Sequence, residues 1–492
     1  MMKLSALLTN ADVLDVAGSL DIEISAVCYD SRKAQPGSLF VALKGGTVNG
    51  SLFIAQAIEK GAVAVVTEER ELQARATIVV VKDARLALAD LAATFYQHPS
   101  RSLKIAGVTG TNGKTTTTFL FKHVCERALL RCGLIGTVRY EVGERILPAS
   151  RTTPEALDVQ ELLWQMRSAG CKAAVMEVSS HALVQARARD VEFDAGIFTN
   201  LTQDHLDFHH TMEAYAQAKS LLFSEMAAQK KKKGKAIINL DDRYGAQLIT
   251  RFGRDLPVTT YGCGAKADFR ASDVRIDFSG TSYQLDANGR SYLVRLPLIG
   301  HFNVYNSLAS IAGAFALGID LRTAVLALAD APPVPGRLEA VPGQRQFRVF
   351  VDYAHTDDAL LNVIKTCHEL KPARLIVVFG CGGNRDRGKR PRMGAVVDQY
   401  ADWGIVTSDN PRKEDPQAII EDIKPGLKRG NYEVIVDRKE AIFKAIAMAQ
   451  PRDIVLIAGK GHEKYQEFAD HTVPFDDVAV ATDALAGKRV EL

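Results

Sequence analysis

The sequence has no long apolar run and no paired cysteine motif, and it carries little net charge. Its 61 basic and 58 acidic residues leave a formal net charge of +3 over 492 residues, so we expect neither nucleic acid nor an anionic membrane as a partner. Residues 302–319 lack charge, but two asparagines and two serines interrupt them, and a buried helix explains them better than a membrane span. After Lys3, polar and acidic residues break up the apolar positions, so we expect no secretory signal.

The seven cysteines are scattered along the chain, and none belongs to a Cys-x-x-Cys pair. An odd and dispersed set favours reduced thiols and a cytoplasmic protein, and it predicts no cysteine metal site. The hydrophobic fraction of 47% and the charged fraction of 24% are typical of a globular protein with ample core material.

Two stretches look like domain boundaries. Residues 96–107 (YQHPSRSLKIAG) end a helix-like pattern and begin a strand, and residues 331–339 (APPVPGRLE) are rich in proline and glycine. They predict three domains, at 1–100, 101–334 and 335–492.

The middle and last segments alternate short apolar runs with longer amphipathic ones, which is typical of βαβ units around a parallel sheet. We therefore predict an α/β protein with a small N-terminal α/β domain, a central P-loop domain with a mainly parallel sheet, and a C-terminal Rossmann-like domain. Ligands bind beyond the carboxyl ends of the strands in such sheets.

The stretch GTNGKTTTT follows the apolar run KIAGVT and leads into a helix-like segment. The usual phosphate loop, G-x-x-x-x-G-K-[ST], would place its first glycine at Val108. Gly110 and Gly113 nevertheless allow backbone N–H groups to turn toward a phosphate. Lys114 can reach the β- and γ-phosphates, and the Thr115 hydroxyl can bind Mg²⁺. The alternative is a glycine turn that only begins a helix, but the order of strand, loop, Lys-Thr and helix favours a phosphate site.

Two further polar residues follow predicted strands. Glu177 comes after AAVM and His205 follows DAGIF, so both lie on the ligand side of the sheet and can face a metal held by Thr115. A lone histidine is more often a core residue. Lys219, in EAYAQAKSLLF, is interpreted from the residues alone as a surface lysine.

The glycine spacing T-G-T-N-G-K-[ST] resembles the loop of the Mur ligase family and of its relative folylpolyglutamate synthetase, enzymes that use ATP to join a carboxylate to an amine. The resemblance implies an ATP site formed by Gly110, Thr111, Asn112, Gly113, Lys114, Thr115, Thr116, Asn303, Arg337, Asp352 and His355. It implies that Lys114, Glu177, His205, Lys219 and Arg337 are catalytic.

In the family a lysine at the place of Lys219 reacts with CO₂. The resemblance therefore implies a carbamate on Lys219 and a pair of Mg²⁺ ions held with Thr115, Glu177 and His205. Such a lysine must be buried so that its amine is neutral. On the residues alone Arg337 can equally be a linker salt bridge, and Asp357 stands where the family's Tyr-Ala-His-Thr-Pro has proline.

The stretch DSRKAQPGSLFVALKG at 30–45 resembles the family's motif for a UDP sugar, in the branch that adds the third residue of the peptide. On composition alone this segment is only a small α/β unit. The resemblance implies a site for UDP-muramoyl-dipeptide formed by Tyr29, Ser31, Gly46, Thr47, Val48, Thr152, Thr153, Ser179, Gln185 and Arg187.

The stretch TSDNPRKEDP at 407–416 follows the apolar run WGIV. Taken alone it is a turn, but its D-N-P-R resembles the diaminopimelate-adding members of the family. The planar fork of Arg412 suits a carboxylate, which diaminopimelate carries at its far end, and it would repel the ammonium of lysine. The implied site comprises Arg385, Asp409, Asn410, Pro411, Arg412, Gly459 and Glu463.

The resemblance implies an ATP-dependent acid–amino-acid ligase of peptidoglycan synthesis. It would add meso-diaminopimelate to UDP-N-acetylmuramoyl-L-alanyl-D-glutamate through an acyl phosphate and release ADP and phosphate. The alternatives are a folylpolyglutamate synthetase-like ligase and a P-loop kinase. We expect a cytoplasmic monomer whose partners are ATP, Mg²⁺, the UDP-muramoyl-dipeptide and meso-diaminopimelate, with no nucleic acid and no membrane.

Overall fold

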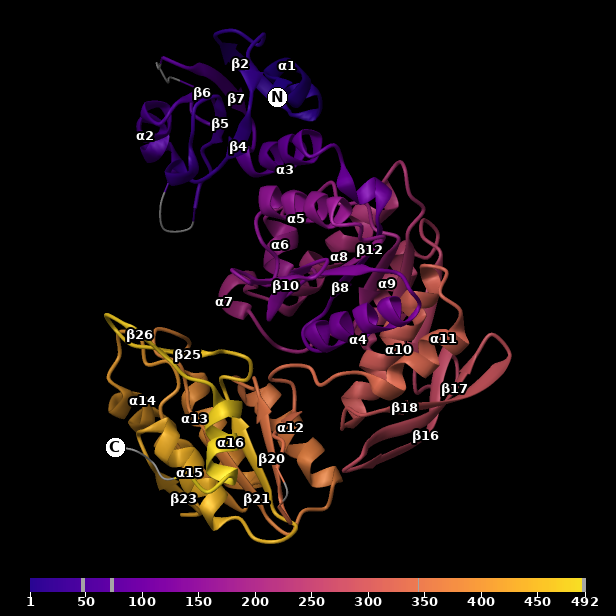
Figure 1. Cartoon of the computed structure of the whole chain (residues 1–492), viewed down its shortest axis with the longest axis vertical. Coiled ribbons are helices and arrows are strands. Elements are labelled where there is room, and N and C mark those ends of the chain that lie inside the picture. The colour runs from indigo at the N-terminus through magenta and orange to yellow at the C-terminus, as the bar shows by residue number, and fades with distance from the viewer. Residues whose placement is uncertain (46–48, 71–74, 344, 489–492) are drawn as a thin grey trace. The chain divides into compact units, whose positions relative to one another are not determined.

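The computed structural model describes residues 1–45, 49–70, 75–343 and 345–488. These residues form two compact units, whose elements are labelled in Figure 1. Unit 1 comprises 1–270, 286–289 and 305–327, and unit 2 comprises 271–285, 290–304 and 328–492. Among the described residues, none of the helices combines the length and the hydrophobicity that a bilayer crossing requires.

Unit 1 begins with a five-stranded sheet in the order β2-β7-β6-β5-β4. Its strands are β2 (Val13–Ala17), β4 (Ala26–Cys28), β5 (Ser38–Val41), β6 (Ala62–Thr67) and β7 (Thr77–Val81). Strands β4 to β7 run parallel, and β2 is antiparallel to β7. The residues of β5 and β7 are buried on both faces, as expected for parallel strands inside a sheet. The remaining elements are β1 (Met2–Lys3), β3 (Glu23–Ile24), α1 (Leu4–Leu7), α2 (Ile54–Glu59) and α3 (Ala84–Phe95).

An eleven-stranded sheet begins in unit 1 with the order β11-β10-β9-β12-β8-β13-β14-β15 and continues through β16, β17 and β18. The six strands from β9 to β15 in this order run parallel, and β10 is antiparallel to both of its neighbours, β9 and β11. Their bounds are β8 (Lys104–Thr109), β9 (Cys132–Ile135), β10 (Arg139–Val142), β11 (Arg145–Pro148), β12 (Ala173–Glu177), β13 (Ala195–Phe198), β14 (Lys235–Asn239) and β15 (Val258–Gly262). Strand β8 is central, with β12 and β13 on its two sides, so the carboxyl ends of these three strands meet at one edge.

Helices connect these strands. They are α4 (Lys114–Arg127), α5 (Ala156–Ser168), α6 (Ser180–Val184), α7 (Leu206–His209), α8 (Met212–Ala228), α9 (Arg243–Phe252), α10 (His301–Ala316) and α11 (Leu321–Ala327). The predicted buried helix over 302–319 is thus α10. Three long strands, β16 (Phe269–Asp277), β17 (Gly280–Ala287) and β18 (Arg290–Leu296), are consecutive neighbours in the sheet order and lie side by side in Figure 1.

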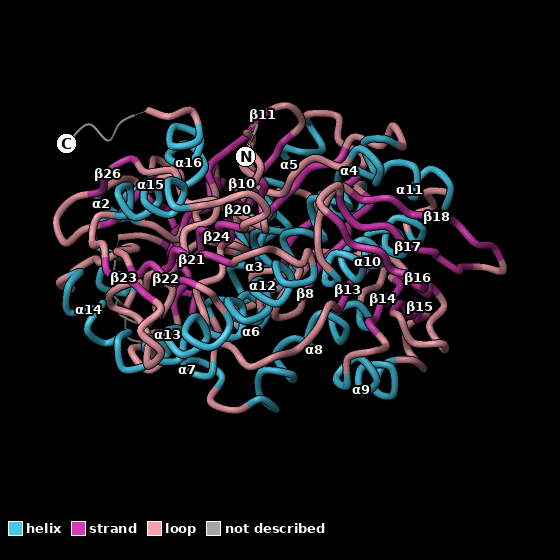
Figure 2. Tube along the Cα trace, turned by 90° about the horizontal axis from the view of Figure 1, so that it is seen from below, coloured by secondary structure: helices cyan, strands magenta, loops and turns pink. Residues whose placement is uncertain are grey.

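Unit 2 contains a six-stranded sheet in the order β19-β20-β24-β21-β22-β23. Only β19 is antiparallel, and β21, β22 and β23 lie next to one another in Figure 2. The bounds are β19 (Glu339–Ala340), β20 (Arg348–Asp352), β21 (Leu375–Phe379), β22 (Trp403–Val406), β23 (Tyr432–Val434) and β24 (Ile454–Ala458), with a separate hairpin of β25 (Tyr465–Glu467) and β26 (Thr472–Pro474).

Helices cover both faces of this sheet. On one face α12 (Asp357–Glu369), α13 (Lys389–Tyr400) and α14 (Pro416–Ile423) bury their apolar residues against it. On the other face α15 (Arg438–Met448) and α16 (Asp477–Leu485) do the same. This three-layer arrangement is the predicted Rossmann-like architecture, and the predicted α/β class is confirmed. The domain boundaries at residues 100 and 334 stay predictions, because unit 1 contains both the N-terminal and the central sheet.

The replacement of the family's proline by Asp357 fits the fold. Asp357 is the first residue of α12, and Thr356 caps the helix by accepting a hydrogen bond from the N–H of Ala359. Proline is favoured at a first helical position because it needs no N–H partner there, and an aspartate is favoured because it complements the helix dipole. Either residue therefore begins the same helix.

Candidate functional site

The loop Gly110–Gly113 joins the central strand β8 to helix α4 and needs its two glycines. Gly110 has φ +149° and Gly113 has φ +86°. A Cβ at Gly110 would clash with Thr199 Oγ1, and one at Gly113 would clash with Asn306 Oδ1. The two glycines therefore stand at the positions where the backbone has a positive φ and another residue leaves no room for a side chain. The loop leads into the N-terminus of α4, where N–H groups can bind phosphate.

Residues directly after β13 hold this loop. The N–H of Thr111 donates to the carbonyl of Asn200 (2.9 Å), and the N–H of Asn112 donates to Asn200 Oδ1 (2.9 Å). The Thr199 hydroxyl donates to the carbonyl of Asn112 (2.6 Å). Sequence reasoning missed Thr199 and Asn200, although both stand at the carboxyl end of a predicted strand.

Two lysines lie on the same backbone carbonyl of the loop. Lys114 Nζ donates to the carbonyls of Gly110 (2.9 Å) and Thr111 (2.7 Å), and Lys219 Nζ donates to the carbonyl of Gly110 (2.7 Å). Lys219 is 2% exposed and lies over the ring of Tyr215. Burial lowers the pKa of Lys219 well below its usual value, and the charge of Lys114 acts in the same direction. The local environment therefore favours a neutral amine at Lys219.

The interpretation of Lys219 as a surface lysine is wrong. The buried residues of α8 are Tyr215, Ala218, Lys219, Ser220, Leu222, Phe223 and Met226. Apart from Ser220, these positions repeat at intervals of three and one, as one face of a helix does. Lys219 falls inside this apolar stripe, and the stripe was the available signal.

Glu177 is the last residue of β12 and is fully buried. Its Oε1 accepts from the N–H of Thr137 (2.9 Å), and its Oε2 accepts from the hydroxyls of Thr137 (3.0 Å) and Thr115 (3.2 Å). All three donors are neutral, and within the described chain no lysine or arginine forms an ion pair with Glu177. A carboxylate and a hydroxyl in contact are oxygen ligands of the kind that Mg²⁺ prefers, so this pair fits the predicted metal. Thr137 was not predicted from the sequence.

His205 lies close to the loop lysines. It occupies the N-cap position of α7 with φ +53°, and its Nε2 is 3.4 Å from Asp204 Oδ2. Partial burial lowers the pKa of His205, Asp204 opposes this, and the charges of Lys114 and Lys219 lower it further. In the described part of the chain, no three His, Cys, Asp or Glu side chains are grouped as a metal site. A metal at Glu177 would therefore take further ligands from elsewhere, such as a phosphate.

The predicted dipeptide residues of unit 1 form one network with Glu177. The Thr153 hydroxyl donates to the carbonyl of Glu177 (2.8 Å) and accepts from the N–H of Ser179 (3.1 Å). Arg187 is buried, and it donates to the carbonyl of Thr153 (3.1 Å) and to Gln185 Oε1 (2.6 Å). Thr152 contacts the Thr137 hydroxyl (3.0 Å).

The predicted uridine residues belong to the N-terminal part of unit 1. The Tyr29 hydroxyl donates to Asp158 Oδ2 (2.6 Å), and the Ser31 hydroxyl donates to Gln56 Oε1 (2.6 Å). Gly46, Thr47 and Val48 lie outside the described residues.

Four residues predicted for the nucleotide belong to unit 2. Arg337 lies over the ring of Tyr353, with 5.1 Å between its guanidinium carbon and the ring centre, and His355 Nδ1 is 2.9 Å from the carbonyl of Tyr353. Asp352 accepts from the N–H groups of Leu338 (2.6 Å) and Ala354 (2.8 Å); burial raises its pKa, and Arg337 opposes the rise. Asn303 lies in α10, where its Nδ2 donates to the carbonyl of Ile299 (2.9 Å).

The predicted amino-acid residues lie on loops that follow β21, β22 and β24 of unit 2. Asn410 Nδ2 donates to Glu463 Oε2 (2.7 Å), which joins two of these loops. Gly459 has φ +118°, and a Cβ there would clash with Asp409 Oδ2. The Pro411 carbonyl lies so close to Gly383 that a Cβ at residue 383 would clash with it.

The two predicted arginines differ in their surroundings. Arg412 Nε donates to Glu467 Oε2 (2.8 Å) and its Nη1 donates to the carbonyl of Gly383 (3.0 Å), while Nη2 has no partner in the described chain. Arg385 is exposed, and its Nη1 donates to the carbonyl of Asn384 (3.2 Å). The fork of Arg412 is thus fixed in direction with part of its donors unused.

A buried arginine behind these loops was missed by sequence reasoning. Arg390 donates from both Nη atoms to the carboxylate of Glu414 (2.9 Å each) and from Nη1 to Asp422 (2.8 Å). These hydrogen bonds are the main reason why the pKa of Glu414 is lowered to about 2. Glu414 also accepts from the N–H of Asn384, so the pair fastens the loop of Arg385 to the loop of Arg412.

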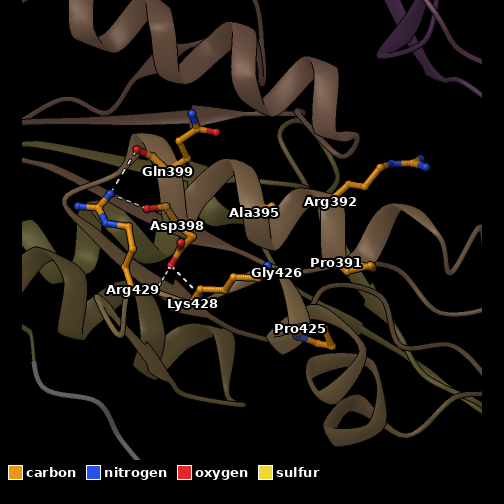
Figure 3. Close-up of a pocket in the computed structure, with 9 residues that line it drawn as sticks. All are labelled: Pro391, Arg392, Ala395, Asp398, Gln399, Pro425, Gly426, Lys428 and Arg429. Carbon is orange, nitrogen blue, oxygen red and sulfur yellow. Dashed lines mark hydrogen bonds between the residues drawn. The ribbon is translucent and has the colours of Figure 1, made fainter.

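A surface hollow elsewhere in unit 2 contains none of the predicted residues (Figure 3). Arg429 donates to the carbonyls of Asp398 (2.7 Å) and Gln399 (3.3 Å), and the Asp398 carboxylate accepts from the N–H groups of Lys428 (2.9 Å) and Arg429 (2.8 Å). These bonds close the C-terminal end of α13, so the polar groups of this hollow have a structural role.

Comparison with known proteins agrees with this geometry. Residues 23–96 match the catalytic domain of the Mur ligase family, residues 108–314 match the Mur ligase middle domain, and residues 336–461 match the Mur ligase glutamate ligase domain. The chain belongs to the Mur ligase family.

Its relatives narrow the comparison. The chain is 45% identical to a UDP-N-acetylmuramoyl-L-alanyl-D-glutamate–2,6-diaminopimelate ligase of Syntrophomonas wolfei, over 99% of this chain and 100% of the relative. An enzyme of the same name from Geobacillus thermodenitrificans is 45% identical with the same coverage. A solved structure of an enzyme of that name is 34% identical, with a TM-score of 0.72 and 99% of each chain covered. The predicted family and the predicted class of enzyme, an amide-forming ligase, are confirmed, and the P-loop kinase alternative is excluded.

Proposed function

We propose that the protein joins meso-diaminopimelate to UDP-N-acetylmuramoyl-L-alanyl-D-glutamate at the expense of ATP, in peptidoglycan synthesis. The observation that carries this proposal is the grouping of Arg412, Asp409 and Glu463 on neighbouring loops of unit 2. A directed guanidinium fork and two nearby carboxylates suit an amino acid whose far end carries both a carboxylate and an ammonium.

The first step would be phosphoryl transfer in unit 1. An oxygen of the substrate's D-glutamyl γ-carboxylate attacks the γ-phosphorus of ATP, the bond to the β,γ-bridging oxygen breaks, and an acyl phosphate and ADP result. The loop N–H groups and Lys114 would hold the phosphates and offset their charge. Thr115 and Glu177 would hold Mg²⁺, which when bound neutralises phosphate charge.

The second step would be amide formation. The neutral amine of diaminopimelate attacks the acyl carbon, phosphate leaves with the electrons of the broken C–O bond, and the nitrogen loses a proton. No side-chain nucleophile is needed, so the residues mainly position reactants and offset charge.

Lys219 supports the first step in this proposal. A neutral amine reacts with CO₂ to give a carbamate and a proton. A lysine that would ordinarily be a cation thereby becomes an anionic oxygen ligand. The lowered pKa of Lys219 and its place on the carbonyl of Gly110 support a carbamate beside the phosphate loop, where it would serve a second Mg²⁺ together with His205.

The UDP-muramoyl-dipeptide would bind elsewhere in unit 1. Arg187 and Thr153 are fastened to Glu177 through short hydrogen bonds, so a dipeptide held there would bring its carboxylate to the loop. Tyr29 and Ser31 would take the uridine end. The roles of Gly46, Thr47, Val48, Asn303, Arg337, Asp352 and His355 stay predictions, as do the two domain boundaries, the monomeric state and the cytoplasmic location.

An acceptor assay tests the proposal. Purified protein is given ATP, Mg²⁺ and the UDP-muramoyl-dipeptide, and then meso-diaminopimelate, lysine or no amine; ADP release and the product mass are measured. We expect ADP release and a tripeptide product with diaminopimelate. Equal use of lysine, or ADP release that ignores the amine, would overturn the assignment. A folate acceptor with glutamate tests the folylpolyglutamate alternative.

A further inference from the structure

Lys460 is a fully buried lysine that the proposed mechanism does not use. It follows β24, between Gly459 and Gly461, and its side chain is 0% exposed. Its Nζ donates to Asn410 Oδ1 (2.8 Å) and to Glu463 Oε2 (3.3 Å). Lysine is almost never fully buried unless it is paired, so these two contacts account for its position.

Asn410 is the centre of this cluster, and its side chain makes three hydrogen bonds inside the protein. Its Oδ1 accepts from Lys460 Nζ and also from the N–H of Glu467 (3.0 Å), and its Nδ2 donates to Glu463 Oε2 (2.7 Å). Asn410 is 2% exposed. It therefore joins the loops after β22 and β24 to strand β25.

One carboxylate oxygen of Glu463 takes no part in these hydrogen bonds. Its Oε2 takes the bonds from Asn410 and Lys460, and its Oε1 has no partner within the described chain. The side chain is 16% exposed. Two donors on one oxygen fix the direction of the carboxylate and leave the other oxygen for a cationic group.

We propose that Lys460 is a positioning residue of the amino-acid site, which through Asn410 and Glu463 presents Glu463 Oε1 to the far-end ammonium of diaminopimelate. The inference rests on the proposed function and deepens it. Lys460 acts on the substrate through Glu463 and does not touch it.

The loss of Lys460 would leave Glu463 poorly held. Without Lys460, the only bonded partner of the Glu463 carboxylate would be the neutral amide of Asn410. One hydrogen bond fixes the direction of a carboxylate less firmly than two, so Oε1 would no longer be held ready for the ammonium.

The test compares Lys460→Met with Lys464→Met. Lys464 lies four residues along and is exposed, and it pairs with Asp476 (2.7 Å), so it is a matched control. KM for diaminopimelate, ATP and the UDP-muramoyl-dipeptide is measured together with kcat. We expect Lys460→Met to raise KM for diaminopimelate at least about tenfold, with the other two KM values within about twofold of the wild type. Lys464→Met should change none of them.

The selectivity of the effect separates this role from a merely structural one. Because Lys460 acts on the substrate only through Glu463, KM for diaminopimelate should rise while kcat at saturating diaminopimelate and the KM values for ATP and the UDP-muramoyl-dipeptide stay close to those of the wild type. An unchanged KM for diaminopimelate, or an equal rise in all three KM values, would overturn the inference.

If Lys460→Met does not fold, Asn410→Leu breaks the same link while Lys460 stays, and the same selective rise is expected. An Asn410→Leu protein with a normal KM for diaminopimelate also refutes the positioning role. A wild type without diaminopimelate-dependent ADP release would instead refute the proposed function itself.

Discussion

Arg412→Ala should change which amino acid the protein uses. The Arg412 guanidinium is held by Glu467 Oε2 at Nε and by the carbonyl of Gly383 at Nη1. Nη2 and the second N–H of Nη1 remain, and together they can hold one carboxylate through two parallel bonds. Diaminopimelate has this carboxylate at its far end and lysine does not.

The expected loss of binding free energy depends on how far solvent reaches the Arg412 guanidinium. Loss of one partner of a buried charge pair typically costs about 2–5 kcal/mol. The Arg412 side chain is 19% exposed and that of Glu467 is 41% exposed, so solvent screens the site and the lower end applies. A loss of about 2 kcal/mol corresponds to roughly thirtyfold in kcat/KM for diaminopimelate. Lysine loses no such bond and is relieved of the repulsion between its ammonium and the guanidinium, so its kcat/KM should stay or rise.

The assay is the ratio of kcat/KM for diaminopimelate to kcat/KM for lysine, measured by ADP release. Arg412 has φ +53°, and any non-glycine residue there has the same backbone strain, so Ala and Lys variants are comparable. Arg412→Lys keeps the charge without the planar fork and should give an intermediate ratio. A ratio within about threefold of the wild type, with normal KM for ATP, would mean that Asp409–Arg412 is only a turn.

Four further outcomes are expected. Lys114→Ala should keep its thermal stability and lose ATP turnover, because it removes the cation on the phosphate loop. Lys219→Met should lose most activity, with partial recovery in short carboxylates, and wild-type activity should fall in CO₂-stripped buffer and return with bicarbonate. Arg438→Met should cost about 3–5 kcal/mol of stability in a denaturant titration, because Arg438 and Asp477 form a pair with both side chains 0% exposed, and the double variant with Asp477→Leu should recover much of it. Glu414 has a pKa lowered to about 2 from 4.5, so its contribution to stability is present above about pH 4.5 and is lost as pH falls toward 2; Glu414→Gln should flatten this part of an acid titration.

The elements that carry the phosphate site were predictable from local patterns. Short apolar runs such as KIAGVT and DAGIF alternate with helical segments, and this period defines a parallel sheet without any knowledge of contacts. Because the carboxyl ends of parallel strands meet at one edge, Glu177 and the loop were expected on the same side of the sheet, and in the structure the Thr115 hydroxyl donates a hydrogen bond to Glu177. The same alternation of apolar runs and helical segments predicted the strands of unit 2.

The contacts that orient the site were not predictable in this way. Thr137 lies 40 residues from Glu177, and Lys460 lies 50 residues from Asn410. Each of these residues is polar and sits in a loop or at a strand end, where sequence pattern gives only a solvent-exposed turn. Their partners are fixed by which loops the topology brings together. Lys219 is different, because its position on the apolar stripe of α8 was visible in the sequence and was outweighed by the usual exposure of lysine.

Both predicted ligand sites of this chain lie at the carboxyl ends of parallel strands, but they suit different chemistry. In unit 1 the carboxyl ends of β8, β12 and β13, with the helices that follow them, supply Lys114, Glu177 and Lys219, residue types that suit phosphate and a metal. In unit 2 the loops after β21, β22 and β24 bring together a guanidinium and carboxylates, which suit a zwitterionic amino acid. The internal network of unit 2, from Arg390–Glu414 to Lys460–Asn410–Glu463, contains no residue of the phosphate loop. Substitutions in the loops of unit 2 can therefore alter the amino acid that is added without changing any residue of the phosphate site in unit 1. For this reason the Arg412 and Lys460 variants are expected to change KM for diaminopimelate and to leave KM for ATP unchanged.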